Sequence, residues 1–223
     1  MGGAAIVSVV AIDGPAGAGK STVARAVAHK LGFAYLDTGA MYRAVALGAL
    51  ERGIDFDDET GLTALTEEVE IDLRENVVLL NGRDVSRAIR EERVTAAVSK
   101  VAAVAGVRRA MASRQRAWAQ AGDVVMEGRD IGSTVAPGAA VKIFLTAGIE
   151  ERAARRAHQL GLATDESSLR ELSESMAGRD RADAERSTSP FVMAPGAVVV
   201  DSTGKDIDEV VDEIAAAVRS ALE

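Results

Sequence analysis

The stretch IVSVVAIDGPAGAGKST (residues 6–22) joins an apolar run to a glycine-rich loop and then to the start of a helix. Residues 6–12 are rich in β-branched side chains, which is typical of a strand buried on both faces of a parallel sheet. Apolar residues recur at helical spacing from Ser21 to Leu31, and Gly32 ends the pattern. The stretch therefore predicts a buried strand, a turn and an amphipathic helix.

The loop between the strand and the helix, Gly14–Ser21, fits the pattern G-x-x-x-x-G-K-[ST]. Glycines let such a loop curl so that its backbone N–H groups point at phosphate oxygens, and the helix that follows adds positive charge at its N-terminus. Lys20 would reach the β- and γ-phosphates, and the Ser21 hydroxyl would bind Mg²⁺. The sequence thus predicts a site for a nucleoside triphosphate, with Mg²⁺ as cofactor.

Strand and helix patterns alternate along the chain, which predicts an α/β fold with a five-stranded parallel sheet and helices on both faces. A small antiparallel insertion is expected at about residues 62–95, where turn signals separate short strands. One long helical stretch is expected over Arg93–Trp118, and the polar residues Gly161–Glu174 are expected to be mobile. The expected parallel strands are Ile6–Ile12, Phe33–Asp37, Asp123–Met126, Val141–Leu145 and Ala197–Val200, and those of the insertion are Val69–Leu73, Val77–Leu80 and Arg83–Val85.

Composition limits the classes of protein to which the chain can belong. Its 223 residues allow one large domain, or one domain with an insertion. No apolar run approaches the ~18 residues that a membrane-spanning helix needs. The 34 acidic and 26 basic residues give a net charge of −8, which disfavours non-specific binding to nucleic acid. The absence of cysteine excludes disulfides and thiolate metal sites, and we expect a cytoplasmic monomer with no membrane or nucleic-acid partner.

Arginines follow the carboxyl ends of two predicted strands, which is where ligands bind in parallel sheets. Arg43 comes soon after residues 37–39 (DTG), and Arg129 lies in residues 127–130 (EGRD). Guanidinium groups bind phosphate bidentately, and phosphoryl transfer depends on positive charge around the transferred group. Arg43 and Arg129 are therefore predicted to bind a second anionic group, which indicates a kinase of a small phosphorylated acceptor.

Other classes of protein with this loop fit the sequence less well. A GTPase should carry N/T-K-x-D after a later strand, and the sequence has no such motif, although residues 201–204 (DSTG) match D-x-x-G near the C-terminus. A motor or transporter ATPase is larger and has an apolar strand that ends in Asp-Glu. Two alternatives stay open. One is a kinase of UMP, AMP or shikimate, and the other is a nucleotide-binding regulatory protein that binds ATP without rapid release of ADP.

Six stretches together resemble the bacterial cytidylate kinase family, and the resemblance runs from about Ile6 to Ala217. The stretches are IDGPAGAGKST (12–22), LDTGAMYRAVAL (36–47), DVSRAIR (84–90), EGRDIGSTVAPGA (127–139), VKIFLTA (141–147) and VVVDST (198–203). Many families share the loop, whereas the combination of LDTGAMYR, GRDIG and a central insertion is much more specific. The resemblance implies a P-loop kinase that uses ATP to phosphorylate CMP, and also dCMP, to the diphosphate.

The resemblance also implies roles for individual residues. ATP would bind to Gly14, Pro15, Ala16, Gly17, Ala18, Gly19, Lys20, Ser21 and Thr22. CMP would contact Thr38, Arg43, Ser99, Arg108, Arg129, Asp130, Arg179, Asp183 and Arg186. Within that set, the base would be read by Ser99, Arg108 and Asp130, and the ribose would contact Arg179 and Asp183. The cationic side chains that act in catalysis would be those of Lys20, Arg129, Arg152, Arg156 and Arg186.

The resemblance further implies one kinase domain over residues 1–223. Its acceptor-binding region would span about residues 38–118, and a short lid over the transferred phosphate would span about 150–187. The sequence departs from the family at a few places: Ser133 stands where Thr is usual, Ala136 and Gly138 replace Phe and Asp, and the run Ser187–Phe191 is unusual. None of these positions is one that would read the nucleotide.

Overall fold

The computed structural model describes residues 8–74 and 77–222. Contacts divide the chain into two compact units: the first comprises the residues up to Tyr35 and those from Ala119 onward, and the second runs from Leu36 to Trp118. Ile6 and Val7 of the first expected strand lie outside the described residues. None of the helices in the described ranges is both long enough and apolar enough to cross a membrane.

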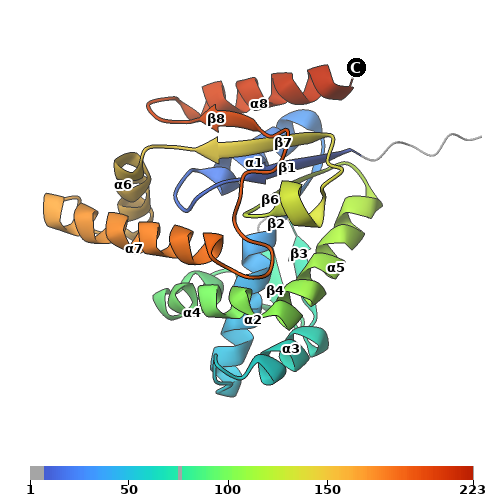
Figure 1. Ribbon diagram of the computed structural model, residues 1–223, viewed down its shortest axis with the longest axis vertical. Helices are drawn as coiled ribbons and strands as arrows, with labels where there is room; N and C mark the ends of the chain where they lie inside the picture. Colours follow the sequence, from blue (N-terminus) through green and yellow to red (C-terminus); the bar gives the residue numbers. More distant parts are fainter. Residues whose placement is uncertain (1–7, 75–76, 223) are drawn as a thin grey trace, which may run out of the picture. The chain divides into compact units, whose positions relative to one another are not determined.

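Five strands form the parallel sheet, in the order β2-β6-β1-β7-β8 (Figure 1). The central strand β1 pairs in parallel with β6 on one side and β7 on the other. β1 and β6 are buried along almost their whole length, whereas only Val200 is buried in the edge strand β8. The predicted α/β fold class and its five strands are confirmed. The strands are β1 (Val9–Asp13), β2 (Ala34–Asp37), β6 (Val124–Gly128), β7 (Val141–Thr146) and β8 (Val198–Asp201).

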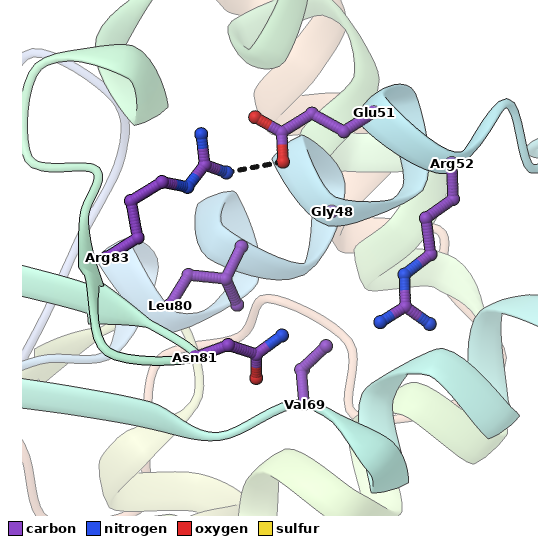
Figure 2. A pocket seen from close by; sticks show the side chains of 7 residues that line it. All are labelled: Gly48, Glu51, Arg52, Val69, Leu80, Asn81 and Arg83. Atoms are coloured by element: carbon purple, nitrogen blue, oxygen red, sulfur yellow. Dashed lines mark hydrogen bonds and ion pairs between the residues drawn. The ribbon is translucent and has the colours of Figure 1, made fainter.

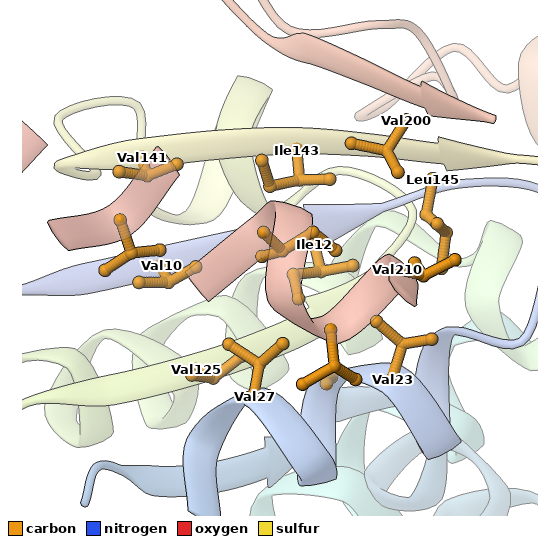
Figure 3. Packing of buried hydrophobic residues seen from close by; sticks show 14 of the residues in the cluster. Val10, Ile12, Val23, Val27, Val125, Val141, Ile143, Leu145, Val200 and Val210 are labelled. Carbon is orange, nitrogen blue, oxygen red and sulfur yellow. The ribbon is translucent and has the colours of Figure 1, made fainter. Parts of the chain in front are cut away.

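Two helices of the first unit, α1 (Lys20–Leu31) and α8 (Ile207–Leu222), pack against each other and against this sheet. Figure 3 shows the apolar side chains between them, with Val10 and Ile12 from the sheet facing Val27 and Val210 from the helices. Removing such branched side chains from water stabilises the fold by about 25 cal/mol for each Å² of apolar surface. This core fixes α1, and with it the loop that precedes the helix.

The second unit contains an antiparallel sheet of β3 (Ile71–Arg74), β4 (Val77–Leu80) and β5 (Arg83–Asp84), which confirms the predicted insertion. Asn81 and Gly82 connect the last two strands with φ values of 51° and 76°, the left-handed conformation that a tight Asn-Gly hairpin turn needs. The helices of this unit are α2 (Thr38–Arg52), α3 (Glu59–Glu68), α4 (Glu92–Ala103) and α5 (Ala105–Ala121), with a short 3₁₀ turn over Ala88–Arg90.

One expectation about helices is wrong. The single helical stretch over Arg93–Trp118 is broken at Val104, whose backbone is extended. Across the break, Arg108 donates to the carbonyl oxygen of Ala102 at 3.2 Å. A tertiary contact adds to this local bond, because Gly106 lies against Thr63 with no room for a side chain. The polar residues 161–174 contain the start of α7 (Glu166–Ala184), which follows α6 (Ile149–Leu160). Asp165 caps α7 by accepting the backbone N–H of Ser168 at 3.0 Å.

Candidate active site

The glycine-rich loop lies in close contact with its neighbours. Gly17 and Gly19 have φ values of 76° and 85°, which glycine adopts far more readily than other residues. A Cβ atom at Gly14 would collide with the carbonyl oxygen of Leu145 at the end of β7, and one at Gly17 would lie 2.6 Å from the Cε of Met176. Glycine is therefore required at both positions for the loop to pack against the sheet and against α7.

Three cations from three segments donate to consecutive carbonyl oxygens of this loop. Lys20 comes from the start of α1, Arg129 from the end of β6, and Arg152 from the first turn of α6. These are three of the five cations predicted for catalysis, and the structure gathers them at one loop. The pairs are Arg129 Nη1 with Gly14 at 3.1 Å, Lys20 Nζ with Pro15 at 2.8 Å, and Arg152 Nη1 with Ala16 at 2.9 Å.

Arg129 has further contacts that fix its orientation. Its Nη1 donates to the carboxylate of Asp180 at 2.8 Å, and its Nη2 lies 3.1 Å from the carboxylate of Asp183. Its guanidinium carbon lies 4.9 Å from the centre of the Phe191 ring, a cation–π contact. The predicted phosphate ligand is thus held on several sides, which leaves its guanidinium little freedom.

Two charged side chains, the half-buried Lys20 and the buried Asp13, lie beside the loop. Burial lowers the pKa of Lys20 to about 8, and the nearby positive charge of Arg129 acts in the same direction. Burial raises the pKa of Asp13 to about 6, although its carboxylate accepts the backbone N–H groups of Gly132 at 2.8 Å and Ile131 at 2.9 Å. Asp13 therefore anchors the single-turn π-helix at Ile131–Val135, and this turn directly follows Arg129 and Asp130.

Asp130, predicted to read the base, is 6% exposed, and its carbonyl oxygen accepts the N–H of Thr134 at 2.9 Å. Its position is therefore set by the same π-helical turn that Asp13 anchors.

The other predicted residues of the first unit lie on α6, on α7 and just after α7. Asp183 is 5% exposed, and Arg186 donates from Nε to the Asp183 carbonyl oxygen at 3.0 Å. The Nε of Arg179 is buried without a hydrogen-bond partner among the described residues, and burial together with the charge of Arg129 lowers the pKa of Arg179. Arg156 donates to Gln159 on its own helix at 3.3 Å.

The predicted acceptor residues of the second unit lie on α2, α4 and α5. Thr38 is 3% exposed at the start of α2. Arg43 donates from Nη1 to Thr95 Oγ1 at 2.8 Å and to the Ile89 carbonyl oxygen at 3.1 Å, which links α2 to α4. Arg108 is 4% exposed, with its guanidinium carbon 5.5 Å from the centre of the Tyr42 ring. Ser99 is half-buried on α4.

The residues present fit the predicted Mg²⁺ chemistry. Ser21 lies in the first turn of α1, its side chain is exposed, and its hydroxyl has no hydrogen bond to any described residue. The described ranges hold no group of three or more acidic or histidine side chains that could bind a metal by themselves. This arrangement suits Mg²⁺, which keeps several waters and binds largely through substrate phosphates.

Sequence reasoning missed four residues of these clusters: Asp13, Thr95, Asp180 and Phe191. Asp180 had a signal, because it lies within the arginine-rich run at residues 179–186 and three residues before Asp183, on the same face of α7. Phe191 belongs to the unusual run Ser187–Phe191, which has no pattern of its own. Its role becomes visible only through its contact with Arg129, which lies far away in the sequence. Asp13 and Thr95 had no local signal, since their partners come from distant parts of the chain.

A pocket of about 300 Å³ opens in the second unit and is drawn in Figure 2. Its rim carries an ion pair between Arg83 and Glu51 at 2.5 Å, and Leu80 and Val69 form its apolar part. None of the predicted site residues lines this pocket, so we do not assign the nucleotide or its acceptor to it.

Comparison with known proteins gives one consistent result. A family model described as cytidylate kinase matches residues 10–220. A cytidylate kinase from Geobacillus kaustophilus is 51% identical over 210 residues, which cover 92% of this chain and 93% of the relative. One from Symbiobacterium thermophilum is 48% identical over 211 residues, with the same coverage. The solved structure of an uncharacterized protein from Eubacterium ventriosum matches this chain with a TM-score of 0.54 at 11% identity. The match covers 96% of this chain and 99% of that protein, and it shows similarity of fold alone.

The matched region contains the glycine-rich loop, the residues around Arg43, the central insertion and the segment with Arg129, all of which the family resemblance singled out. Since the match runs almost from end to end and two relatives are about half identical, the chain belongs to the cytidylate kinase family.

Proposed function

We propose that this chain transfers the γ-phosphoryl group of ATP to CMP, and also to dCMP, with release of ADP. The observation that carries the proposal is the set of three cations, Lys20, Arg129 and Arg152, on consecutive carbonyl oxygens of the loop. Phosphoryl transfer needs little covalent help from a protein and much positive charge held in position around the transferred group. Membership of the cytidylate kinase family supports CMP as the acceptor.

The loop would hold ATP through its backbone N–H groups, because its left-handed glycines let the chain curl around phosphate oxygens. Lys20 lies near the end of the loop, and its ammonium would keep one N–H on the Pro15 carbonyl oxygen and donate the others to the β- and γ-phosphates. The Ser21 hydroxyl would hold Mg²⁺, which neutralises part of the phosphate charge when it is bound. The binding of ATP and of Mg²⁺ would therefore depend on one continuous segment, the loop and the first turn of α1.

In the transfer itself, an oxygen of the CMP phosphate attacks the γ-phosphorus, and the bond from that phosphorus to the β–γ bridging oxygen breaks. The products are CDP and ADP, and the charge that develops on the bridging oxygen needs nearby cations. The attacking oxygen is already anionic at neutral pH, so no strong general base is required. We assign Arg129 and Arg152 to the transferred group, since both are anchored at the loop.

The family resemblance implies which residues would recognise CMP. Cytosine presents an amino donor at N4 beside an acceptor at N3, whereas uracil presents an acceptor at O4 beside a donor at N3. The Asp130 carboxylate would accept from the cytosine amine, and Ser99 and Arg108 would donate to N3 and O2. We assign the ribose to Arg179 and Asp183, and the CMP phosphate to Thr38, Arg43, Arg129 and Arg186.

A coupled ADP-release assay tests the proposal. ATP, Mg²⁺ and the chain are combined with CMP, dCMP, UMP, AMP or shikimate, and one reaction contains no acceptor. We expect CMP and dCMP to give rapid ADP formation and the other acceptors to give much less. ADP formation fastest with UMP, AMP or shikimate would favour another kinase of small acceptors. ATP binding without acceptor-dependent ADP release would favour a regulatory protein.

A further inference from the structure

Asp180 contacts the glycine-rich loop and two of the cations beside it, although it is not among the site residues predicted from the sequence. Its Oδ1 accepts from Arg129 Nη1 at 2.8 Å and from the backbone N–H of Ala16 at 3.1 Å. Its Oδ2 accepts from Arg152 Nη1 at 2.7 Å. One carboxylate on α7 thus joins the glycine-rich loop to the arginines that follow β6 and begin α6.

We propose that Asp180 is a positioning residue for phosphoryl transfer, whose carboxylate aligns Arg129 and Arg152 with the glycine-rich loop. This inference rests on the proposed function, because it concerns the cations that would stabilise the transferred group. Asp180 itself would not contact the reacting atoms.

The first argument is electrostatic. The guanidinium groups of Arg129 and Arg152 and the Lys20 ammonium bind to adjacent carbonyl oxygens of one loop. Positive charges that lie close together repel each other. A carboxylate between the two arginines offsets this repulsion, and hydrogen bonds between ionised partners are short and directional. The side chains of Arg129, Arg152 and Asp180 are 16%, 11% and 15% exposed, so water screens these interactions only in part.

The second argument concerns the direction of Arg152. Its Nε donates to the Ala147 carbonyl oxygen at 3.2 Å, and its Nη1 is shared by Ala16 and Asp180. Its Nη2 has no hydrogen-bond partner among the residues that the structure describes. The hydrogen bonds of Nε and Nη1 therefore leave Nη2 for a ligand oxygen. Asp180 contributes to this choice because it binds Nη1.

The protonation state of Asp180 agrees with this role. Burial raises the pKa of the carboxyl, but the charge of Arg129, the Ala16 N–H and the hydrogen bond from Arg152 outweigh burial and lower the pKa below its usual value. Asp180 is therefore ionised at neutral pH. An amide in its place could accept only on its oxygen and would turn its two N–H donors toward the arginines.

The test compares wild type with Asp180→Asn and Asp180→Glu in the ADP-release assay with CMP, and measures kcat and both KM values. Glu174→Gln is the matched control, because it removes one exposed negative charge from the same helix. We expect Asp180→Asn to lower kcat about 10- to 100-fold, the scale for misplaced catalytic groups, and to change the KM for ATP much less. Asp180→Glu should recover part of the loss, and Glu174→Gln should match wild type.

A double-mutant cycle with Arg152→Lys shows whether Asp180 acts through Arg152. Coupled residues give non-additive effects, so Asp180→Asn should cost less kcat in the Arg152→Lys background than in wild type. Melting temperatures of all variants identify loss of folding, and Asp180→Glu supplies a second folded variant if Asp180→Asn unfolds.

Three results would overturn the inference: a wild-type kcat in folded Asp180→Asn, equal losses in both backgrounds, or tighter ATP binding with undiminished kcat. The last result would mean that Asp180 competes with phosphate for the arginines. Failure of the proposed function is a separate result, since wild type itself would then release no ADP in response to CMP.

Discussion

The guanidinium of Arg129 lies over the ring of Phe191, 4.9 Å from its centre, and this ring stacks in turn on Phe144 with 5.7 Å between ring centres. We expect Phe191→Leu to lower kcat/KM for CMP about 2- to 5-fold, because it keeps an apolar side chain but removes a cation–π contact worth about 0.5–1 kcal/mol. Steady-state kinetics with varied CMP measure the effect. Phe56→Leu in the second unit is the control, and an equal loss there would mean that the contact with Arg129 has no specific role.

Lys20→Ala should lower kcat at least ~10²-fold, which is the scale for removal of one donor that stabilises a transition state. The ammonium is buried beside the loop and would contact the phosphates more strongly as charge moves during transfer. Single-turnover rates with saturating ATP and CMP measure the effect, and Lys30→Ala at the other end of α1 is the control. Near-normal turnover in folded Lys20→Ala would contradict the assignment of the loop to ATP.

Asp130→Ala should reduce the preference for CMP over UMP by about 1–3 kcal/mol, the range for one pair at the edge of a base. The buried carboxylate can accept from the cytosine amine, whereas uracil O4 would leave it unpaired. The measurement is kcat/KM for each acceptor in wild type and variant. A lower activity with an unchanged ratio would show that Asp130 supports the π-helical turn or Arg129 and does not read the base.

Asp183→Asn should lower kcat/KM for CMP more than for dCMP, because dCMP lacks one hydroxyl that a carboxylate could accept from. Both substrates should lose activity, since Asp183 also lies 3.1 Å from Arg129 Nη2 and 3.6 Å from Arg186 Nη2. The excess loss with CMP measures the contact with the ribose. Equal losses would limit the role of Asp183 to holding the two arginines.

Asp13 makes stability depend on pH. Its pKa is about 6 in the folded chain and 3.8 for an ordinary aspartate, so the folded state binds more protons between these values. Asp130 raises this pKa and Lys20 lowers it, but burial is the largest cause. The stability of wild type relative to Asp13→Asn should therefore fall as pH rises from about 4 to about 7, by at most about 3 kcal/mol. Urea unfolding at several pH values measures this difference, and a difference that stays constant would contradict the shifted pKa.

The parts of the molecule that the sequence predicted correctly are those with a local cause. The strand, loop and helix at residues 9–31 follow from hydrophobic spacing and from glycines at fixed positions. The break at Val104 lies beside the contact between Gly106 and Thr63, which no window of neighbouring residues contains. The contacts of Asp180 are equally non-local, because its partners Ala16, Arg129 and Arg152 lie 164, 51 and 28 residues away.

The hydrogen bonds from Lys20, Arg129 and Arg152 to consecutive loop carbonyl oxygens have a consequence for net charge. A carbonyl oxygen is an uncharged acceptor, so it fixes the direction of a cation without cancelling its charge, as a carboxylate would. Lys20 is held in this way by Pro15, whereas Arg129 and Arg152 also contact the carboxylate of Asp180, and Arg129 contacts that of Asp183 as well. The Pro15 carbonyl oxygen thereby fixes the direction of the Lys20 ammonium in advance and leaves its positive charge for a ligand with several negative charges of its own.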